Sequence, residues 1–159
     1  MEIKTLYTDI ITAPFGELFI SATDSHLVSV SFTEQVSVNP NHLTAEVKTQ
    51  LQAYLDGTLK IFDLPLQTKG TEFQISVWNI LHEIQFGTAI SCLELAKRLG
   101  NEKVIRASAS ANGKNPIPII IPCHRVIGSN KSLMGFSGGI EKKRWLLTHE
   151  GFLKPDLFS

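Results

Sequence analysis

The sequence predicts an α+β protein, in which a small antiparallel sheet with one helix precedes a mostly helical domain. Short alternating or β-branched segments are confined to the first third of the 159 residues, and apolar residues at helical spacing dominate the remainder. Charge balance and residue pattern both change near Lys69-Gly70-Thr71, which indicates a join between two lobes. We therefore expect an N-terminal α/β lobe over residues 1–68 and a second domain over residues 69–159.

Three strands and one helix are expected first in the N-terminal lobe. The strands are separated by turn-forming residues. They are expected over Leu6–Ile11, Glu17–Ala22 and Leu27–Phe32. Leucine or valine then recurs at every fourth position from Leu43 to Leu55, which predicts a helix with one apolar face that ends near Gly57. Ile61–Leu66 has the composition of one more strand.

The second domain begins with two expected helices. An apolar stripe that starts at Phe73 predicts the first helix, which is stopped by Phe86-Gly87. The side chain of Ser91 can cap a second helix that runs through Arg98, with Glu94 at the third helical position as in a capping box.

A turn signal, Leu99-Gly100-Asn101, separates this second helix from Lys103–Asn112, a segment rich in small residues that is expected to be helical. Two short helices joined by a glycine-containing turn resemble a helix-turn-helix, whose second helix commonly enters a DNA groove. Many helical hairpins bind nothing, so this pattern alone leaves both interpretations open.

The segment after this hairpin cannot remain helical, because Pro116 disfavours α geometry at Asn115. An apolar run then leads to Pro122-Cys123-His124, and residues 128–139 form a loop with four glycines.

The last helix is expected over about Ile140 to His149, with Trp145 and either Leu146 or Leu147 facing inward. Trp78 and Trp145 are both interpreted as core anchors.

The net charge of zero conceals an asymmetry between the two parts. Residues 1–68 carry three Lys or Arg against eight Asp or Glu, and residues 69–159 carry twelve against seven. A basic half hints at polyanion binding, although chance segregation of solvated charges is the alternative. No apolar stretch reaches the roughly 20 residues that span a bilayer, and the start lacks the pattern of a signal peptide. We therefore expect a cytoplasmic protein that does not bind membranes.

Two cysteines, Cys92 and Cys123, are too few for a disulfide scaffold or a cysteine-rich zinc site. The histidines outside the cysteine motif show no metal-ligand spacing, so no metal site is expected. These histidines are His26, His42, His82 and His149.

Cys123 lies directly before the cationic pair His124-Arg125. Cationic neighbours favour the thiolate, so Cys123 is a candidate activated nucleophile, whereas a free cysteine after an apolar run is more often an inert core residue. A bridging water, or a bend in the chain, would let His124 take the thiol proton. Glu150 is a candidate for the group that orients His124, which would complete a nucleophile, base and orienter.

The run Pro122-Cys123-His124-Arg125-Val126, preceded by Asn115-Pro116 and followed by Ser137-Gly138-Gly139, closely resembles the O6-alkylguanine-DNA alkyltransferases, or methylated-DNA–protein-cysteine methyltransferases. The similarity is continuous over about residues 73–151, whereas residues 1–68 match only as a variable lobe. The resemblance implies an RNase H-like N-terminal lobe and a helix-turn-helix in the second domain.

The resemblance implies irreversible, stoichiometric repair of O6-alkylguanine, and of O4-alkylthymine, in double-stranded DNA. The damaged nucleotide would be flipped out of the duplex, because the O6 alkyl carbon is inaccessible to an in-line attack within the stack. Cys123 would accept the alkyl group as a stable thioether. No metal or organic cofactor is implied, and a monomer is expected.

The resemblance also implies roles for individual residues. Cys123 would accept the alkyl group, His124 would remove its proton through water, and Glu150 would orient the histidine. Asn115 would brace the turn between the recognition helix and the nucleophile. Arg106 would enter the base stack in place of the extruded base, because its planar cation can stack and hydrogen-bond together.

Further residues are implied in DNA binding and in the guanine pocket. Asn101 and Ser129 match positions that contact DNA. The pocket positions are Cys92, Val126, Phe136, Ser137 and Gly138.

Two positions depart from the family's pattern. Cys92 stands where better-known members carry a tyrosine, whose hydroxyl is credited with donating a hydrogen bond to the guanine. Cysteine is a poor donor, so we expect weaker assistance to the leaving group or a substitute for it. Phe136 likewise stands where a tyrosine is frequent, which keeps an apolar wall but loses a hydroxyl.

Three other functions are considered. A non-catalytic alkyltransferase-like protein would recognise alkylguanine without repairing it, but such relatives usually carry tryptophan in place of Cys123. A transcriptional regulator of this family would carry an extra cysteine-rich metal domain, which this sequence does not contain. A thiol protease would need an oxyanion hole that the motif's context does not suggest.

Overall fold

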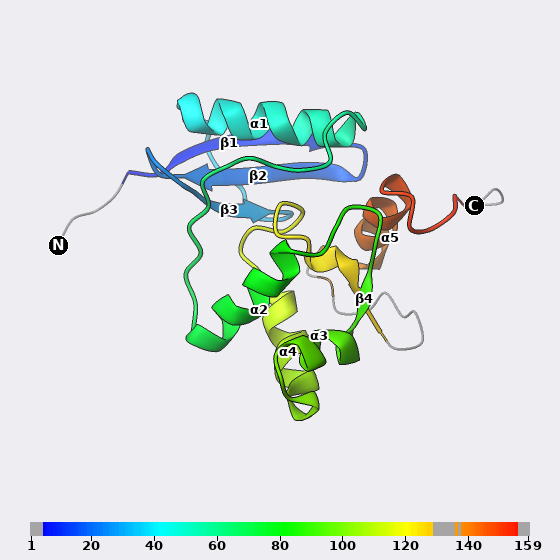
Figure 1. The fold of residues 1–159 in the computed structure, drawn as a ribbon. Helices are drawn as coiled ribbons and strands as arrows, with labels where there is room; N and C mark the ends of the chain where they lie inside the picture. The colour runs from blue at the N-terminus through cyan, green and yellow to red at the C-terminus, as the bar shows by residue number, and fades with distance from the viewer. Residues whose placement is uncertain (1–4, 129–135, 137, 156–159) are drawn as a thin grey trace. The chain divides into compact units, whose positions relative to one another are not determined.

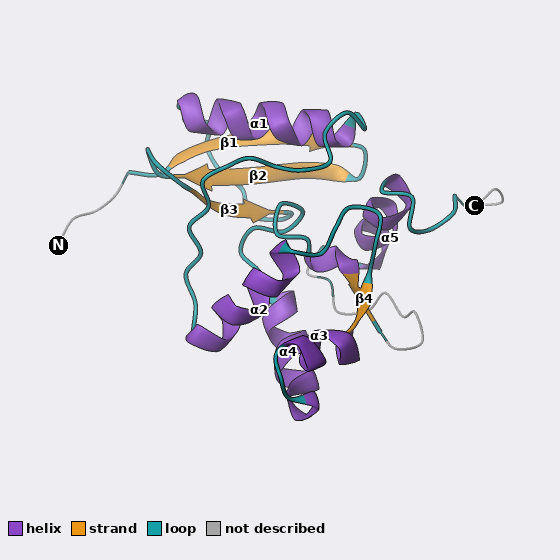
Figure 2. Ribbon diagram, in the orientation of Figure 1, coloured by secondary structure: helices purple, strands orange, loops and turns teal. Residues whose placement is uncertain are grey.

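The computed structural model describes residues 5–128, 136 and 138–155. The chain divides into two compact units, Met1–Lys69 and Gly70–Ser159. Figure 1 traces both units from blue to red, and Figure 2 distinguishes their helices from their strands. Within the described residues, no helix combines the length and the apolar character that a membrane span requires.

The first unit contains a three-stranded antiparallel sheet in the order β1-β2-β3. The strands are β1 (Tyr7–Ala13), β2 (Gly16–Ala22) and β3 (Leu27–Ser31). Ala13 pairs with Gly16 across a two-residue turn, and Gly16 has a φ of 130°, a conformation that favours glycine. The three expected strands are therefore confirmed to within a residue or two at each end.

Helix α1 (His42–Leu55) packs along this sheet, as Figure 1 shows. It begins with a reciprocal capping box, in which the side chains of Asn41 and Thr44 each accept from the other's backbone N–H. Val47 and Leu51 are fully buried, which agrees with the four-residue spacing of the apolar positions.

The expected strand over Ile61–Leu66 does not form. Only Leu66 makes an isolated bridge, with Leu27, while the Pro65 carbonyl accepts from the Leu27 N–H at 2.8 Å. Pro65 has no N–H to donate to a ladder, and Ile61 is 83% exposed, so this segment runs beside β3 without pairing along its length.

The second unit is mostly helical, with one very small parallel sheet. Its elements are α2 (Glu72–His82), β4 (Ile90–Ser91), α3 (Cys92–Arg98), the 3-10 helix η1 (Glu102–Val104), α4 (Ile105–Gly113), the 3-10 helix η2 (Cys123–Arg125), β5 (Val126–Ile127) and α5 (Ile140–His149). A sheet-plus-helix unit is therefore followed by a mostly helical unit, which confirms the expected α+β fold.

The helix-turn-helix is formed by α3 and α4, which pack against each other and against α2. Ser91 caps α3 by accepting from the Glu94 N–H at 3.0 Å, as expected. The reciprocal half of a capping box is not among the described contacts of α3, and the Glu94 carboxylate instead pairs with Arg98. Gly100, with a φ of 88°, makes the turn that the sequence predicted.

One of the two tryptophans expected to be buried in the core is only half-buried. Trp78 is buried in α2 and donates from Nε1 to the Ala111 carbonyl at 2.8 Å, so it is a core anchor. Trp145 is only half-buried, and its ring stacks on that of His149 with 4.7 Å between the ring centroids, whereas Leu146 and Leu147 both face the core. The interpretation of Trp145 as a core anchor was therefore wrong, because two adjacent leucines take the inward face of α5.

Candidate active site

Cys123 is the first residue of η2 and is 2% exposed. Its N–H donates to the Ile121 carbonyl at 2.8 Å. Its carbonyl accepts from the Val126 N–H and from Nδ2 of Asn112, the latter at 3.3 Å. The nucleophile candidate is therefore held at both of its peptide groups.

Asn115 braces the loop that leads to Cys123. Its Nδ2 donates to the Ile121 carbonyl at 2.7 Å, and its Oδ1 accepts from the Ile117 N–H at 3.0 Å. Within this loop, Ile119 has a φ of 73°, which a β-branched residue rarely adopts, and its side chain is buried. The side-chain bonds of Asn115 and the packing of Ile119 thus maintain an unfavourable backbone conformation directly before the cysteine.

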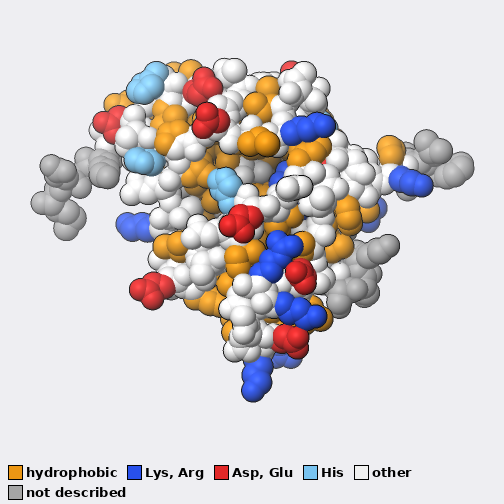
Figure 3. Space-filling model, in the orientation of Figure 1, with side chains coloured by type: hydrophobic (Ala, Val, Ile, Leu, Met, Phe, Trp, Pro, Cys, Tyr) orange, Lys and Arg blue, Asp and Glu red, His pale blue; other side chains and the backbone are white. Residues whose placement is uncertain are grey.

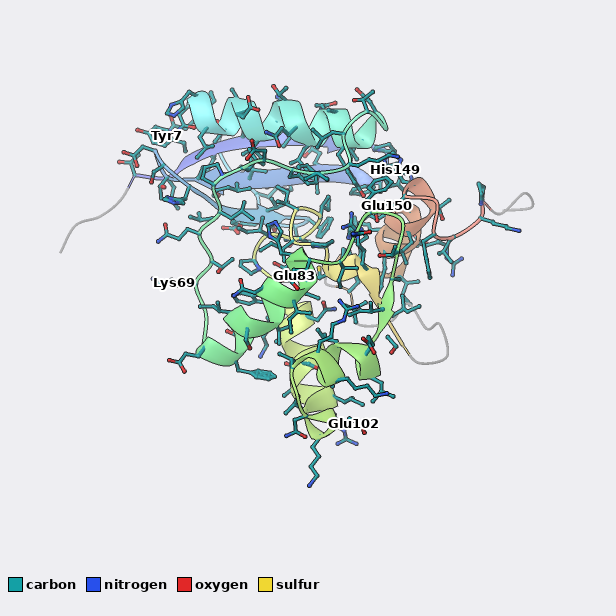
Figure 4. The ribbon with its side chains drawn as sticks, viewed as in Figure 1. Tyr7, Lys69, Glu83, Glu102, His149 and Glu150 are labelled. Carbon is teal, nitrogen blue, oxygen red and sulfur yellow. The ribbon has the colours of Figure 1, made fainter. Side chains whose placement is uncertain are left out.

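His124, Arg125 and Glu150 form one buried cluster. Nε2 of His124 lies 2.7 Å from Oε2 of Glu150. Arg125 donates to both oxygens of the same carboxylate, from Nε at 2.8 Å and from Nη2 at 2.9 Å, and donates to the Ile84 carbonyl at 2.5 Å. Figure 4 labels Glu150 where it follows α5. The carboxylate therefore holds the histidine and the arginine together.

The cluster determines which nitrogen of His124 carries a proton. Hydrogen bonds from His124 and Arg125, and their charges, hold the pKa of Glu150 well below its ordinary value against the opposing effect of burial. Burial lowers the pKa of His124, so the imidazole is neutral near pH 7. Because Glu150 is ionised and only accepts, Nε2 must be the N–H. Nδ1 is then a lone-pair acceptor, and it has no partner among the described residues.

Cys123 rests as a thiol rather than as a thiolate. Burial raises the pKa of Cys123 to about 11, while the side-chain hydrogen bond of Asn115 and the charge of Lys143 oppose that rise. Arg125, the neighbour expected from the sequence to favour the thiolate, turns its guanidinium to Glu150 and Ile84 instead. Adjacent residues in the chain point in different directions, so the cation that acts on Cys123 comes from α5.

Four of the expected pocket residues lie in the described part of the chain. Cys92 is half-buried as the first residue of α3, Val126 and Phe136 are buried, and Gly138 is half-buried. The parallel pairing of β4 with β5, which the sequence did not predict, aligns Ile90 with Val126 and so ties the start of α3 to the nucleophile's segment. Ser137 lies outside the described residues.

Two of the expected DNA-contacting residues are exposed on the helix-turn-helix. Arg106 projects from the first turn of α4, and Asn101 caps η1 by accepting from the Lys103 N–H at 2.9 Å. Ser129, the third, lies outside the described residues. On the face in Figure 3, basic and acidic side chains alternate over α3 and α4, so this surface is not uniformly positive.

A cavity of about 420 Å³ lies at the end of α2 and the start of β4, but no expected pocket residue lines it. Its lining residues are Glu83, Ile84, Gln85, Thr88, Ala89, Ile90 and Arg98. No group of three or more His, Cys, Asp or Glu side chains that could hold a metal ion occurs in the described part of the chain.

Comparison with known proteins identifies the family. Residues 72–152 match the model of the 6-O-methylguanine DNA methyltransferase DNA-binding domain, and residues 6–68 match that of its ribonuclease-like domain. The chain belongs to the 6-O-methylguanine DNA methyltransferase family. The second match agrees with the RNase H-like lobe that the resemblance implied.

Relatives and solved structures support this membership over most of the chain. The methylated-DNA–protein-cysteine methyltransferase of Methanosarcina acetivorans is 41% identical, over 92% of this chain and 99% of its own. The constitutive enzyme of that name from Bacillus subtilis is 39% identical, over 86% and 90%. The structure of Mycobacterium tuberculosis OGT in complex with DNA matches with a TM-score of 0.84 and 38% identity, over 95% of this chain and 97% of that one.

The sequence did not indicate the contacts that two buried residues make around this site. Arg125 stood in the cysteine motif, but its pairing with Glu150 depends on a contact across 25 positions. Lys143 carried a local signal that was not used: it precedes Leu146 and Leu147 by three and four residues. That spacing places it on the buried face of α5.

Proposed function

We propose that this chain is a DNA-repair alkyltransferase that moves the alkyl group of O6-alkylguanine in double-stranded DNA onto Cys123, once per molecule. The observation that carries the proposal is the buried arrangement of Cys123 beside a neutral His124 that is held by Glu150. Membership of the methyltransferase family, and a DNA complex solved for a protein 38% identical, support the same substrate.

The first step is removal of the thiol proton. Nδ1 of His124 is the free acceptor, and it receives the proton of Cys123 through a bridging water. Glu150 then stabilises the imidazolium that forms, and Arg125 keeps Glu150 ionised and in place. A thiol with a pKa raised by burial becomes a nucleophile only while this base is available.

The second step is an in-line displacement at the alkyl carbon. A bond forms between that carbon and Sγ of Cys123, the bond to O6 breaks, and its electron pair stays on the guanine, which takes up a proton. Cys92, Val126, Phe136, Ser137 and Gly138 are proposed to line the pocket. The thioether product is stable, so the reaction is proposed to be stoichiometric. No cofactor is part of the proposed reaction.

The helix-turn-helix is proposed to hold the duplex while the damaged nucleotide is flipped out. Arg106 on α4 would fill the place of the extruded base, and Asn101 and Ser129 would contact DNA. Asn115 would brace the turn between α4 and Cys123. In this proposal, residues 69–159 carry both DNA binding and alkyl transfer, and residues 1–68 form the accompanying α/β lobe.

The same chemistry is proposed to extend to O4-alkylthymine, whose alkyl carbon is likewise bonded to an exocyclic oxygen. The protein is further proposed to act as a monomer in the cytoplasm.

The direct test is the intact mass of the protein after incubation with a duplex that contains O6-methylguanine. One methyl adduct, mapped to Cys123 by peptide analysis and missing in Cys123→Ser, is the expected result. A matched duplex with unmodified guanine is the control. DNA binding without any adduct would reject alkyl transfer.

That second outcome would favour a non-catalytic damage-binding protein of the same family. The presence of Cys123 beside a base and its orienter argues for transfer, because a protein that only binds alkylguanine has no need of an acceptor thiol.

A further inference from the structure

Asn112 is a buried polar residue near the end of α4, and its side chain has no part in the reaction described above. It is 4% exposed, and its Nδ2 donates to the carbonyl of Cys123 at 3.3 Å. A carbonyl oxygen only accepts, so the amide must present Nδ2, and not Oδ1, to Cys123. This hydrogen bond therefore fixes Oδ1 of Asn112 as an acceptor beside the residue that carries the nucleophile.

Two buried side-chain atoms lack a hydrogen-bond partner among the described residues, Nδ1 of His124 and Oδ1 of Asn112. The first is the acceptor of the thiol proton in the proposed reaction. The second has no such task, although a buried acceptor that stays unpaired lowers the stability of a fold. An unpaired acceptor beside the reacting residue is suited to a donor that the substrate brings.

The carbonyl of Cys123 is a neighbouring acceptor, but it is already used. It accepts from the Val126 N–H and from Nδ2 of Asn112, which is one donor for each of its two lone pairs. A base that approaches Cys123 therefore finds its open acceptor in Asn112 and not in this carbonyl.

O6-alkylguanine carries one N–H donor group, the 2-amino group. Alkylation at O6 removes the hydrogen from N1, so N1, N3 and N7 all accept. The 2-amino group lies on the same Watson–Crick edge as O6, and this is the edge at which flipped bases are read. A base that turns its O6-alkyl group toward Sγ of Cys123 therefore presents its donor on the same side.

We propose that Oδ1 of Asn112 accepts a hydrogen bond from the 2-amino group of the flipped O6-alkylguanine, an inference that rests on the alkyl-transfer function proposed above. Asn112 then favours guanine over thymine. O4-alkylthymine has no N–H donor on this edge and presents the acceptor O2 in the corresponding place. The amide cannot turn to suit thymine, because its Nδ2 is held by the carbonyl of Cys123.

Burial of Asn112 is compatible with this contact. Cys123 is 2% exposed, so an alkyl group reaches Sγ only after the cover over this residue opens, and Asn112 is bonded to the same residue. A buried water is the other donor that could satisfy Oδ1. A water would act alike whether or not the base carries an amino group, so the two partners are distinguished by experiment.

The test compares two duplexes that differ by one amino group, with O6-methylguanine or O6-methylhypoxanthine at the same position. The rate at which S-methyl Cys123 forms is measured with both duplexes in single-turnover mixing. The proteins are the full-length wild type and Asn112→Leu, which has a similar shape but no acceptor. Asn112→Asp keeps an acceptor oxygen and is the conservative variant. Lys114→Gln changes an exposed residue two positions along and is the matched control.

The quantity compared is the ratio of the rates with the two duplexes. A merely structural defect slows both reactions alike, and any difference in duplex stability is common to all variants, so neither changes this ratio from one variant to the next. The wild type is expected to react about tenfold faster with O6-methylguanine, because the other base leaves a buried acceptor unpaired. Asn112→Leu should bring the ratio close to one, while Asn112→Asp and Lys114→Gln keep the preference.

Circular dichroism checks that each variant is folded, and Asn112→Met is a second apolar replacement should the leucine variant not fold. Equal wild-type rates with the two duplexes would overturn the inference and leave the proposed function standing. A folded Asn112→Leu with the wild-type ratio would do the same, since the amino group would then be read elsewhere. A wild type that takes no methyl group from either duplex would instead reject the proposed function, and the inference with it.

Discussion

Nε2 of His124 lies 2.7 Å from Oε2 of Glu150, and neither side chain is exposed to solvent. The pair leaves Nδ1 as the free acceptor of the imidazole. The same carboxylate receives two hydrogen bonds from Arg125, so a single acidic residue sets the tautomer of His124 and also pairs with a buried guanidinium.

Replacing Glu150 with Gln is expected to slow methyl transfer by a factor of about 100 or more, because the amide can donate to Nε2 and so favour the wrong tautomer. The rate is measured by the appearance of S-methyl Cys123 in single-turnover mixing with O6-methylguanine duplex. Glu141→Gln, at an exposed position in the first turn of α5, is the control and should leave the rate unchanged. An unchanged rate in Glu150→Gln would remove Glu150 from the mechanism.

Arg125→Met is expected to destabilise the fold by about 3 to 5 kcal/mol, since it leaves the buried Glu150 carboxylate without its bidentate partner. Arg125→Lys keeps the charge but loses the paired donors, so its loss of stability should be smaller than that of Arg125→Met. Urea unfolding gives both values. If the methionine variant is as stable as the wild type, the cluster contributes nothing to stability.

Stability is expected to fall in acid because the pKa of Glu150 is lower in the folded protein than in the unfolded chain. Above the pKa that Glu150 has in the unfolded chain, its full contribution to the free energy of unfolding is present. Below about pH 4.5 the unfolded chain takes up the proton first, and this residue's contribution declines by about 1.4 kcal/mol per pH unit. Urea unfolding between about pH 3 and pH 7 should show the difference between wild type and Glu150→Gln narrowing in acid. A constant difference over that range would contradict the assignment.

Cys92→Tyr is expected to raise the rate of methyl transfer, because it restores a hydroxyl donor at the start of α3 where the family's pattern has one. Cys92→Phe supplies the ring without the hydroxyl and is the matched control. Equal rates in the tyrosine variant and the wild type would mean that another group already assists the leaving guanine.

Arg106→Ala is expected to slow transfer from duplex DNA far more than transfer from the free base O6-benzylguanine, which needs no flipping. The two rates are compared in the same preparation. Arg106 is exposed on α4, so the fold should be unaffected. A parallel loss with both substrates would place Arg106 in the chemical step instead of in DNA binding.

The parts of the fold that local pattern determines could be predicted from the sequence. Leu43 to Leu55 repeats at helical spacing and forms α1, and Ser91 caps α3 as its side chain predicts. The strand expected over Ile61–Leu66 does not form. An alternating apolar pattern does not reveal whether a sheet edge is free to pair, or whether Pro65 interrupts the hydrogen-bond ladder.

The site was harder to predict where it depends on contacts between distant segments. The resemblance to the family implied roles for Cys123, His124 and Glu150 together. The buried charges were not foreseen: Arg125 turns away from the thiol, and Lys143 approaches it from α5. The pairing of β4 with β5 involves two residues on each strand, too short a segment for any periodicity to indicate.

The end of α4 is tied to the nucleophile's segment at two points, where Asn112 holds the Cys123 carbonyl and Asn115 holds the Ile121 carbonyl, and it is tied to α2 where Trp78 holds the Ala111 carbonyl. These bonds couple the position of the helix to that of the cysteine. If α4 enters a DNA groove as proposed, the depth to which it enters would also set how far the sulfur can reach. A nucleotide that is only partly extruded would then stop short of the sulfur, so alkyl transfer would require complete extrusion of the damaged nucleotide.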